Sequence, residues 1–246
     1  MRLIIQPDYQ SVSKWAAHYV AAKINASKAT AEKPFVLGCP TGSSPLGMYR
    51  ELIELNKKGL VSFQNVVTFN MDEYVGLPKE HPESYYSFMW NNFFDHINID
   101  LNNTNVPCGV NMDAEGECAR YDALSQSYGG IDLQLLGLGP NGHIGFNEPD
   151  DYFPKGTHKV QLTDATIQAN KRFFEKEEDV PRYAYTMGIC DIMQAKRVVM
   201  VVSGESKAGI VKEAFFGPVT PRVPASILQL HKDFTLVADE AALSQL

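Results

Sequence analysis

The chain has 246 residues, of which 44% are hydrophobic and 21% are charged, and its formal net charge at pH 7 is −7. This composition is typical of a globular protein, and the negative charge argues against a nucleic-acid-binding surface. No stretch approaches the ~20 apolar residues of a membrane span, and the N-terminal apolar run is too short for a signal peptide. The four cysteines show no CxxC spacing, so we expect a cytoplasmic protein without a disulfide or zinc framework.

Strands and helices alternate along the predicted chain. A short strand at residues 2–6 precedes SVSKWAAHYVAAKINA, a helical segment with Ser11 as its expected N-cap. Apolar runs follow, each ending in a turn-rich loop: PFVLGCPTGSS, VVTFNMDEY, IDLQLLGLGPNGH, RVVMVVSGESK and FTLVADE. Their hydrophobicity is continuous, as in strands buried on both faces, and helical stretches such as PLGMYRELIELNKKG separate several of them. We therefore predict a single α/β domain, residues 1–246, built on a parallel doubly wound sheet.

The loop after the second apolar run has the features of an anion-binding turn. Thr41, Gly42 and Ser43 follow a buried strand, and Pro45 opens a helix. Free N–H groups at a helix start, hydroxyl groups and a glycine that permits close approach can hold an anion. The spacing is not that of a P-loop. The alternative is a serine that merely caps the helix, and this segment taken alone favours that alternative.

Carboxylates follow the next strand. Asp72 and Glu73 come directly after VVTFNM, at the edge of the sheet where ligands bind in this class of fold. A partly buried carboxylate at such a position can act as a general base. The alternative is an aspartate that caps a turn.

The segment GLGPNGHIGFNEP places an imidazole and a carboxylate on one glycine-rich loop. His143 and Glu148 are separated by Gly145, so the chain can fold back and bring them together. A carboxylate that orients an imidazole makes a positioned proton shuttle, and Asn141 can orient a neighbour or bind a substrate hydroxyl. The spacing matches no strong metal-ligand pattern, so no metal is expected. A histidine packed into a glycine-rich turn is the structural alternative.

A second candidate for anion binding follows a later strand. Lys207 lies at the start of the helix in SGESKAGIVKEAF, where a cation is unfavourable beside the helix dipole unless an anion offsets it. A lysine on a solvated helical turn is the alternative. Together the loops predict proton transfer on a phosphorylated small molecule.

These motifs, taken together, resemble the glucosamine-6-phosphate deaminase family. The matching segments are CPTGSSPLGMYRELI, FNMDEYVGL, GLGPNGHIGFNEP, KRFF, SGESKA and PASILQLH, which cover essentially the whole chain in order. The resemblance implies a hydrolase of amino-sugar catabolism that converts glucosamine 6-phosphate and water into fructose 6-phosphate and ammonia. It also implies the family's fold, a modified doubly wound, Rossmann-like, mostly parallel sheet with helices on both faces.

The resemblance further implies roles for individual residues. Asp72 would move the C2 proton toward C1 of the open-chain sugar, His143 would open the pyranose ring, and Glu148 would orient that histidine. The residues that match the family's phosphate site are Thr41, Gly42, Ser43, Arg172 and Lys207. The segment QLTDATIQANKRFF resembles a mobile lid, which we place around residues 155–180. No metal or organic cofactor is expected, because the C1 carbonyl of the opened sugar acidifies the C2–H bond.

The sequence departs from the family pattern at two places. Many relatives carry Asp where this chain has Asn141, and since Asn cannot relay a proton we expect it to orient its neighbours. The chain stops at Leu246, without the longer C-terminal segment of the allosteric relatives. The activator site of those relatives also uses basic residues at positions where this chain has His158, Lys159 and Val160. We therefore expect weak or absent activation by N-acetylglucosamine 6-phosphate. The oligomeric state, monomer or homo-oligomer, stays open.

Two rival functions are less consistent with the motifs. A 6-phosphogluconolactonase shares the glycine-rich loop, but its loop leads to a Ser-Leu-Phe-Pro pattern rather than FNEP, and it needs no base at C2. A sugar-phosphate-sensing domain of a transcription regulator follows a helix-turn-helix module and tends to lose the catalytic carboxylates, whereas Asp72, His143 and Glu148 are all present.

Overall fold

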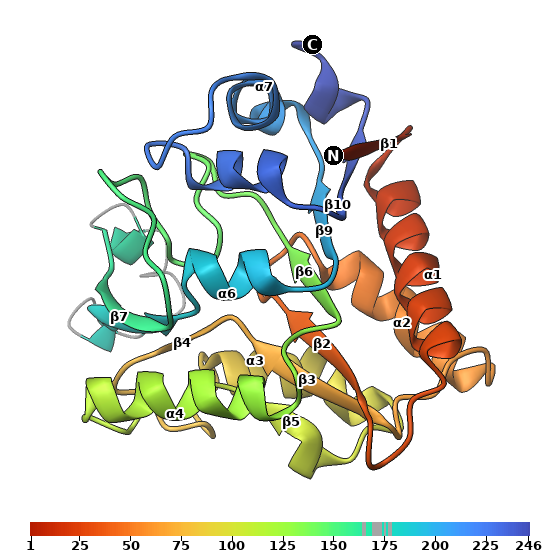
Figure 1. Ribbon diagram of the computed structural model, residues 1–246, viewed down its shortest axis with the longest axis vertical. Coiled ribbons are helices and arrows are strands. Elements are labelled where there is room, and N and C mark those ends of the chain that lie inside the picture. Colours follow the sequence, from red (N-terminus) through yellow and green to blue (C-terminus); the bar gives the residue numbers. More distant parts are fainter. Residues whose placement is uncertain (164–165, 169–173, 175, 177–178) are drawn as a thin grey trace.

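A seven-stranded sheet forms the centre of the molecule. The computed structural model describes residues 1–163, 166–168, 174, 176 and 179–246. The strand order is β1-β10-β9-β6-β2-β3-β5, and every neighbouring pair is parallel (Figure 1). The strands are β1 (Arg2–Gln6), β2 (Phe35–Cys39), β3 (Val66–Asn70), β5 (Thr104–Asn105), β6 (Leu133–Leu136), β9 (Val198–Val202) and β10 (Phe234–Asp239). The parallel sheet predicted from the continuous apolar runs is confirmed.

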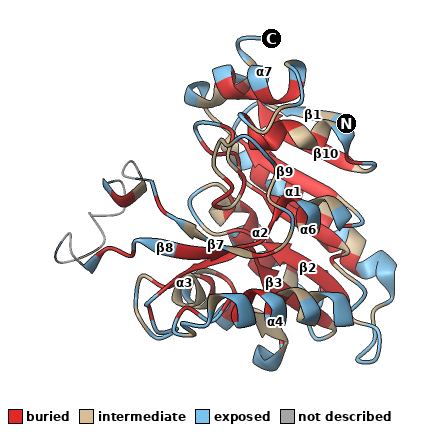
Figure 2. Ribbon diagram, turned by 60° about the vertical axis from the view of Figure 1, so that its left-hand side comes forward, coloured by how far each residue is buried: buried red, intermediate tan, exposed pale blue. Residues whose placement is uncertain are grey.

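Helices cover both faces of this sheet, as predicted. One face packs against α1 (Tyr9–Ser27), α2 (Leu46–Lys57) and α3 (Tyr85–Asn92), and the other against α4 (Ala114–Ser127), α6 (Ile189–Gln194) and α7 (Ala208–Phe216). Each face has its own apolar core, and the central strands are buried along their length (Figure 2). Short 3-10 helices are η1 (Phe94–His96), η2 (Leu101–Asn103), η5 (Glu205–Lys207), η6 (Pro224–Leu230) and η7 (Ala241–Leu243). In the described part of the chain, no helix is long and apolar enough to cross a membrane.

A second, antiparallel sheet lies beside the first and was not predicted. It consists of β4 (Asp72–Tyr74), β8 (Tyr183–Thr186) and β7 (His158–Gln161), in that order. The backbone of Met71 joins the two sheets, because its N–H donates to the carbonyl of Cys39 and its carbonyl accepts from the N–H of Met187. Asp72 therefore begins a strand instead of a loop. A strand of three residues is too short to give a hydrophobic period that sequence reasoning can detect.

The first helix begins earlier than the sequence suggested. Asp8 is the N-cap of α1, and its carboxylate accepts a hydrogen bond of 2.7 Å from the N–H of Ser11. Ser11, the expected cap, is thus a residue of the first turn. Asp and Ser are both good N-cap residues, and the segment contains Asp8 and, three positions later, Ser11.

The direction of the chain across the sheet reverses between β2 and β6. From β2 the chain continues to β3 and β5 on one side, whereas from β6 it continues to β9 and β10 on the other. A crevice forms outside the carboxyl ends of the strands at such a switch point, and ligands of open α/β sheets bind there. The glycine-rich loops that follow β2 and β6 therefore lie beside each other.

Candidate active site

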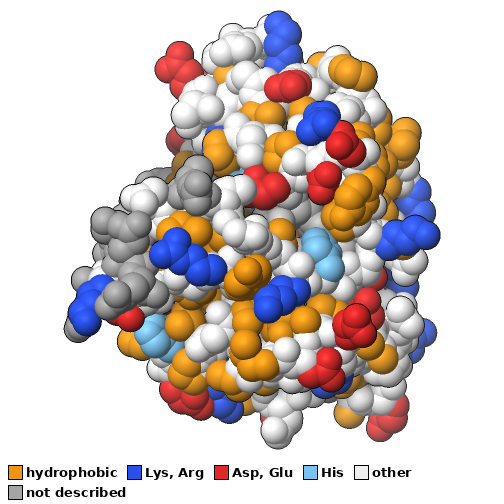
Figure 3. Space-filling view, turned by 90° about the vertical axis from the view of Figure 1, so that its left-hand side faces the viewer, with side chains coloured by type: hydrophobic (Ala, Val, Ile, Leu, Met, Phe, Trp, Pro, Cys, Tyr) orange, Lys and Arg blue, Asp and Glu red, His pale blue; other side chains and the backbone are white. Residues whose placement is uncertain are grey.

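A cavity of about 270 Å³ lies at this switch point and gathers most of the predicted site residues. Its walls include Thr41, Gly42, Ser43, Asp72, His143 and Lys207. These residues come from the ends of different strands, so the fold brings together what the sequence separates. Acidic and basic side chains are interspersed on the face shown in Figure 3. An anion would therefore be recognised by the local groups of the cavity rather than by a broad basic surface.

The loop after β2 lines the cavity and is braced by Tyr9. Gly42 has a φ of +88°, in the region that favours glycine, which permits the sharp turn. The hydroxyl of Tyr9 donates to the carbonyl of Ser43 at 3.1 Å and accepts from the N–H of Gly47 at 2.8 Å. The loop is thereby fixed against the start of α2, a helix end suited to an anion.

Lys207 supplies a cation to the same cavity. Its Nζ donates to the carbonyl oxygen of Leu138 at 2.7 Å, and its side chain is partly buried. Burial lowers the pKa of this ammonium group. A phosphate in the cavity would offset the charge that burial disfavours. This geometry fits the expected anion site.

Asp72 is almost fully buried at the inner end of the cavity. Its exposure is 7%, and burial, followed by the charge of Glu73, raises its pKa to about 8. Gly145 leaves room beside it, because a Cβ atom there would lie 3.5 Å from Asp72 Oδ2 and 2.8 Å from Thr186 Oγ1. The carboxyl group is thus desolvated but reachable, as a base for a carbon acid must be.

His143, Asn141 and Glu148 form one hydrogen-bonded group. His143 Nδ1 lies 2.8 Å from Asn141 Oδ1 and 3.4 Å from Glu148 Oε1, and Asn141 Nδ2 donates to Glu148 Oε2 at 2.7 Å. Because a carboxylate only accepts, the amide nitrogen must face Glu148, and the amide oxygen must face the imidazole. In the neutral imidazole, Nδ1 then carries the proton and Nε2 is free to accept one.

The carboxylate of this group stays ionised. Burial alone would raise the pKa of Glu148, but the hydrogen bond and charge of His143, together with the amide of Asn141, hold it below its usual value. Asn147 closes the turn between them, since its Nδ2 donates to the carbonyl groups of Ile144 and Met187. The chain folds back as the sequence suggested, and Asn147 is a bracing residue that the sequence did not single out.

Some predictions fall outside this geometry. Arg172, expected at the phosphate site, lies outside the described residues, and so does part of the expected lid around residues 155–180. Sequence reasoning missed Tyr85, which lies in the wall of the cavity. It named Glu73 beside Asp72 as a candidate carboxylate but gave it no role of its own, and the structure buries it next to Asp72. The roles of all the site residues stay predictions.

Known proteins resemble the chain over its whole length. The model of the family "Glucosamine-6-phosphate isomerases/6-phosphogluconolactonase" matches residues 7–237. Curated glucosamine-6-phosphate deaminases from Bacteroides thetaiotaomicron and Thermoanaerobacter pseudethanolicus are 60% and 51% identical to it, covering 100% and 99% of the chain and 92% and 94% of the relatives. A solved monomeric glucosamine-6-phosphate deaminase superimposes with a TM-score of 0.93 at 42% identity, over 100% of both chains. A 6-phosphogluconolactonase from Trypanosoma brucei shares the fold, with a TM-score of 0.74 at 17% identity over 100% of this chain and 98% of the other.

Proposed function

This chain belongs to the family of glucosamine-6-phosphate isomerases and 6-phosphogluconolactonases, and we propose that it is a glucosamine-6-phosphate deaminase, with Asp72 and His143 as its acid–base residues. It converts glucosamine 6-phosphate and water into fructose 6-phosphate and ammonia. The observation that carries this assignment of residues is a single cavity that holds a buried carboxylate, an oriented imidazole and a half-buried cation. Deaminases that are 51% to 60% identical to the chain support the choice of reaction.

The reaction begins at the sugar ring. Nε2 of His143 accepts the proton of the anomeric hydroxyl and returns it to the ring oxygen, so that the C1–O5 bond breaks and the open-chain aldehyde forms. Asn141 and Glu148 hold the imidazole in the required tautomer. A fixed tautomer lets one nitrogen both accept and donate without rotation of the ring.

Asp72 acts on the open-chain sugar. Its carboxylate removes the proton from C2 while a proton of the substrate's own C2 ammonium group passes to the aldehyde oxygen, which gives the enolamine. The same carboxyl group returns a proton to C1, leaving a C2=N iminium, to which water adds before ammonia leaves. The buried position keeps water from the transferred proton, and Thr41, Gly42, Ser43 and Lys207 hold the phosphate group that fixes C1 and C2 beside the base.

A product assay tests this proposal. Purified protein is given glucosamine 6-phosphate with a metal chelator present, and ammonia and fructose 6-phosphate are measured; 6-phosphogluconolactone is the parallel substrate. Equal release of both products despite the chelator supports a metal-free deaminase. Turnover of the lactone alone would replace the proposal by a lactonase. A cytoplasmic location stays a prediction.

The rate should depend on pH through Asp72. The carboxyl group accepts a proton only when it is ionised, and its pKa is about 8 in the free protein. We therefore expect kcat/KM to rise roughly tenfold per pH unit below about pH 8. At alkaline pH it should fall again as Lys207, whose pKa burial lowers, loses its charge. A profile that is flat between about pH 6 and 8 would contradict the role of Asp72.

Removal of the Lys207 ammonium should mainly weaken binding. A hydrogen bond to a charged group contributes about 1.5–3 kcal/mol, so Lys207→Ala should raise KM roughly 10- to 100-fold and change kcat less. Lys212→Ala, at an exposed position of the same helix α7, is the matched control. A fall in kcat at unchanged KM would show that Lys207 does not hold the phosphate group.

A further inference from the structure

Glu73 is a second buried carboxylate directly beside the proposed base. It is 2% exposed and follows Asp72 in β4. Successive side chains of a strand point to opposite faces. Asp72 accordingly lines the cavity of the site, whereas Glu73 lines a different cavity of about 540 Å³. The two carboxyl groups thus lie on opposite faces of the same strand, β4.

The Glu73 carboxylate binds the beginning of α3. Oε1 accepts from the N–H groups of Tyr74 at 2.8 Å and Tyr85 at 2.9 Å, and Oε2 accepts from that of Tyr86 at 3.0 Å. The latter two belong to the first turn of α3, whose free N–H groups favour an anion. Tyr85 lines the cavity of the site. Glu73 therefore fixes a wall of the site against the strand that carries the base.

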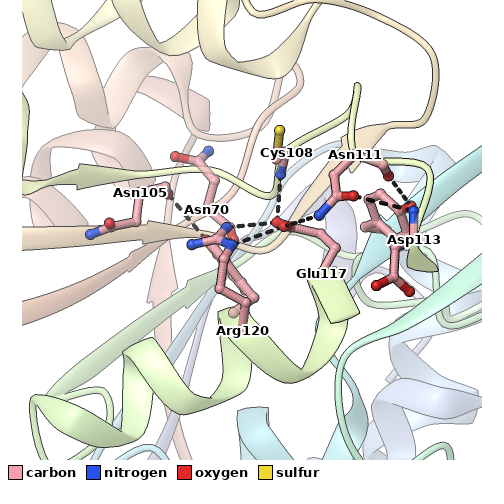
Figure 4. Close-up of polar contacts among 9 residues, drawn as sticks. Asn70, Asn105, Cys108, Asn111, Asp113, Glu117 and Arg120 are labelled. Atoms are coloured by element: carbon pink, nitrogen blue, oxygen red, sulfur yellow. Dashed lines mark hydrogen bonds and ion pairs between the residues drawn. The ribbon is translucent and has the colours of Figure 1, made fainter. Parts of the chain in front are cut away.

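The loop at residues 108–111 shields Glu73 from behind. A Cβ atom on Gly109 would lie 2.3 Å from the carbonyl oxygen of Tyr74 and 3.4 Å from Glu73 Cγ, so the backbone packs closely there. Glu117 anchors this loop, because it accepts from the N–H of Cys108 at 2.7 Å and pairs with Arg120 (Figure 4). The loop also forms part of the wall of the 540 Å³ cavity, and Glu73 is buried between this loop and its own strand.

Glu73 and Glu117 differ in how their charges are balanced. Glu117 has a guanidinium partner, whereas within the described residues the charge of Glu73 is stabilised by backbone N–H groups. Those N–H groups fix the carboxylate in place without cancelling its full charge. Above about pH 7, where Glu73 is ionised, a negative charge therefore lies behind Asp72.

We propose that Glu73 is a positioning residue of the deamination, whose carboxylate holds α3 and Tyr85 against Asp72 and whose negative charge strengthens Asp72 as the base for the C2 proton. The inference rests on the proposed function. A nearby like charge disfavours the ionised form of a carboxyl group and so increases its affinity for a proton. A general base works best when its affinity matches the working pH.

The titration behaviour of the neighbouring groups agrees with this role. Burial, and then the charge of Glu73, raise the pKa of Asp72 to about 8, and burial raises the pKa of Glu73 to about 7 although its three backbone hydrogen bonds lower it. Burial also raises the pKa of Tyr74 to about 12 and those of Tyr85 and Tyr121 well above the ordinary value, so these phenols stay neutral. The other titratable groups that line the two cavities are Lys79, Glu80, Tyr86, Cys108, His143 and Lys207.

The test compares pH profiles of three variants. Glu73→Gln removes the charge, and we expect the midpoint of the rise in kcat/KM to move about one pH unit lower and the plateau of kcat to fall roughly three- to tenfold. Glu73→Asp keeps the charge and should restore the midpoint of the unmodified protein. Glu117→Gln is the matched control. It removes the charge of another buried glutamate that accepts a backbone hydrogen bond, and it should leave the midpoint unchanged. A purely structural Glu73 would lower the rate at every pH without moving the midpoint, and that result overturns the inference.

A carbon-13 NMR titration of the Asp72 carboxyl group separates this inference from the proposed function. The unmodified protein should show a two-step titration of Asp72, in which the smaller step at lower pH reports the ionisation of Glu73. This holds whether or not ammonia is released, so failure of the product assay overturns only the proposed function. It also needs no variant, so it decides the matter if Glu73→Gln does not fold. A single-step titration of Asp72 overturns the inference.

Discussion

Replacement of Asp72 by Asn is expected to lower kcat on glucosamine 6-phosphate by ~10²–10⁴-fold, the loss typical of a positioned acid–base group. Asn has nearly the same shape but cannot accept the C2 proton. KM should change much less, because the phosphate-binding groups lie on other loops of the cavity. Asp95→Asn, at an exposed position, serves as the control. Near-normal turnover of the Asp72 variant would show that another group is the base.

The same substitution should stabilise the protein at neutral and alkaline pH. The pKa of Asp72 is about 8 in the folded protein, against 3.8 for an ordinary aspartate. Between about pH 4 and 8 the folded protein holds a proton that the unfolded chain has released, so the free energy of unfolding falls as the pH rises through this window. Asn has no such proton to lose. The gain at pH 8 is on the order of a few kcal/mol, or several degrees in Tm.

Thermal unfolding of both proteins across this pH range measures the effect. The Tm curves of the unmodified protein and of Asp72→Asn should meet near pH 4 and separate progressively up to about pH 8. Parallel curves would mean that the carboxyl group is not desolvated in the folded protein. The Asp72 carboxyl group thus lowers the stability of the fold and is kept because the reaction requires it. Such trade-offs between stability and activity are common at active sites.

The sequence predicted the parts of this molecule that depend on local patterns. Five apolar runs were long enough to be recognised as buried parallel strands, and their order fixes the loops after β2 and β6 at one edge of the sheet. The turn between His143 and Glu148 is local too, since the two residues are only five positions apart and Gly145 lies between them. These features needed no knowledge of the tertiary structure.

Other features depend on contacts between distant segments. The position of Asp72 in a strand results from its pairing with Thr186, more than a hundred residues later. Glu73 becomes important only because α3 places its first N–H groups on that carboxylate, and nothing in the letters MDEY distinguishes it from a solvated glutamate. Glu117 likewise acquires its role from the loop at residues 108–111. A strand of three residues and a buried anion held by N–H groups leave no periodic pattern to read.

The second large effect is expected at His143. Gln in its place can still bond to Asn141 but cannot carry a proton between the anomeric hydroxyl and the ring oxygen. The enzyme then depends on the open-chain sugar that forms spontaneously in solution, and we expect kcat to fall by ~10²–10⁴-fold. His96→Gln, at an exposed position, is the control and should leave the rate unchanged.

Chemical rescue shows whether the lost step is proton transfer. In His143→Gly the space of the side chain is open to the cavity, so added imidazole should restore part of the rate, and N-methylated imidazole should restore less because it has lost one exchangeable proton. The restored rate should follow the neutral form of the added base, since the tautomer set by Asn141 leaves Nε2 as an acceptor. Full activity of His143→Gln would contradict the role of His143 in ring opening. An inactive variant that imidazole does not rescue would instead indicate that His143 holds the loop in shape, and ring opening would then have to be assigned to another group of the cavity.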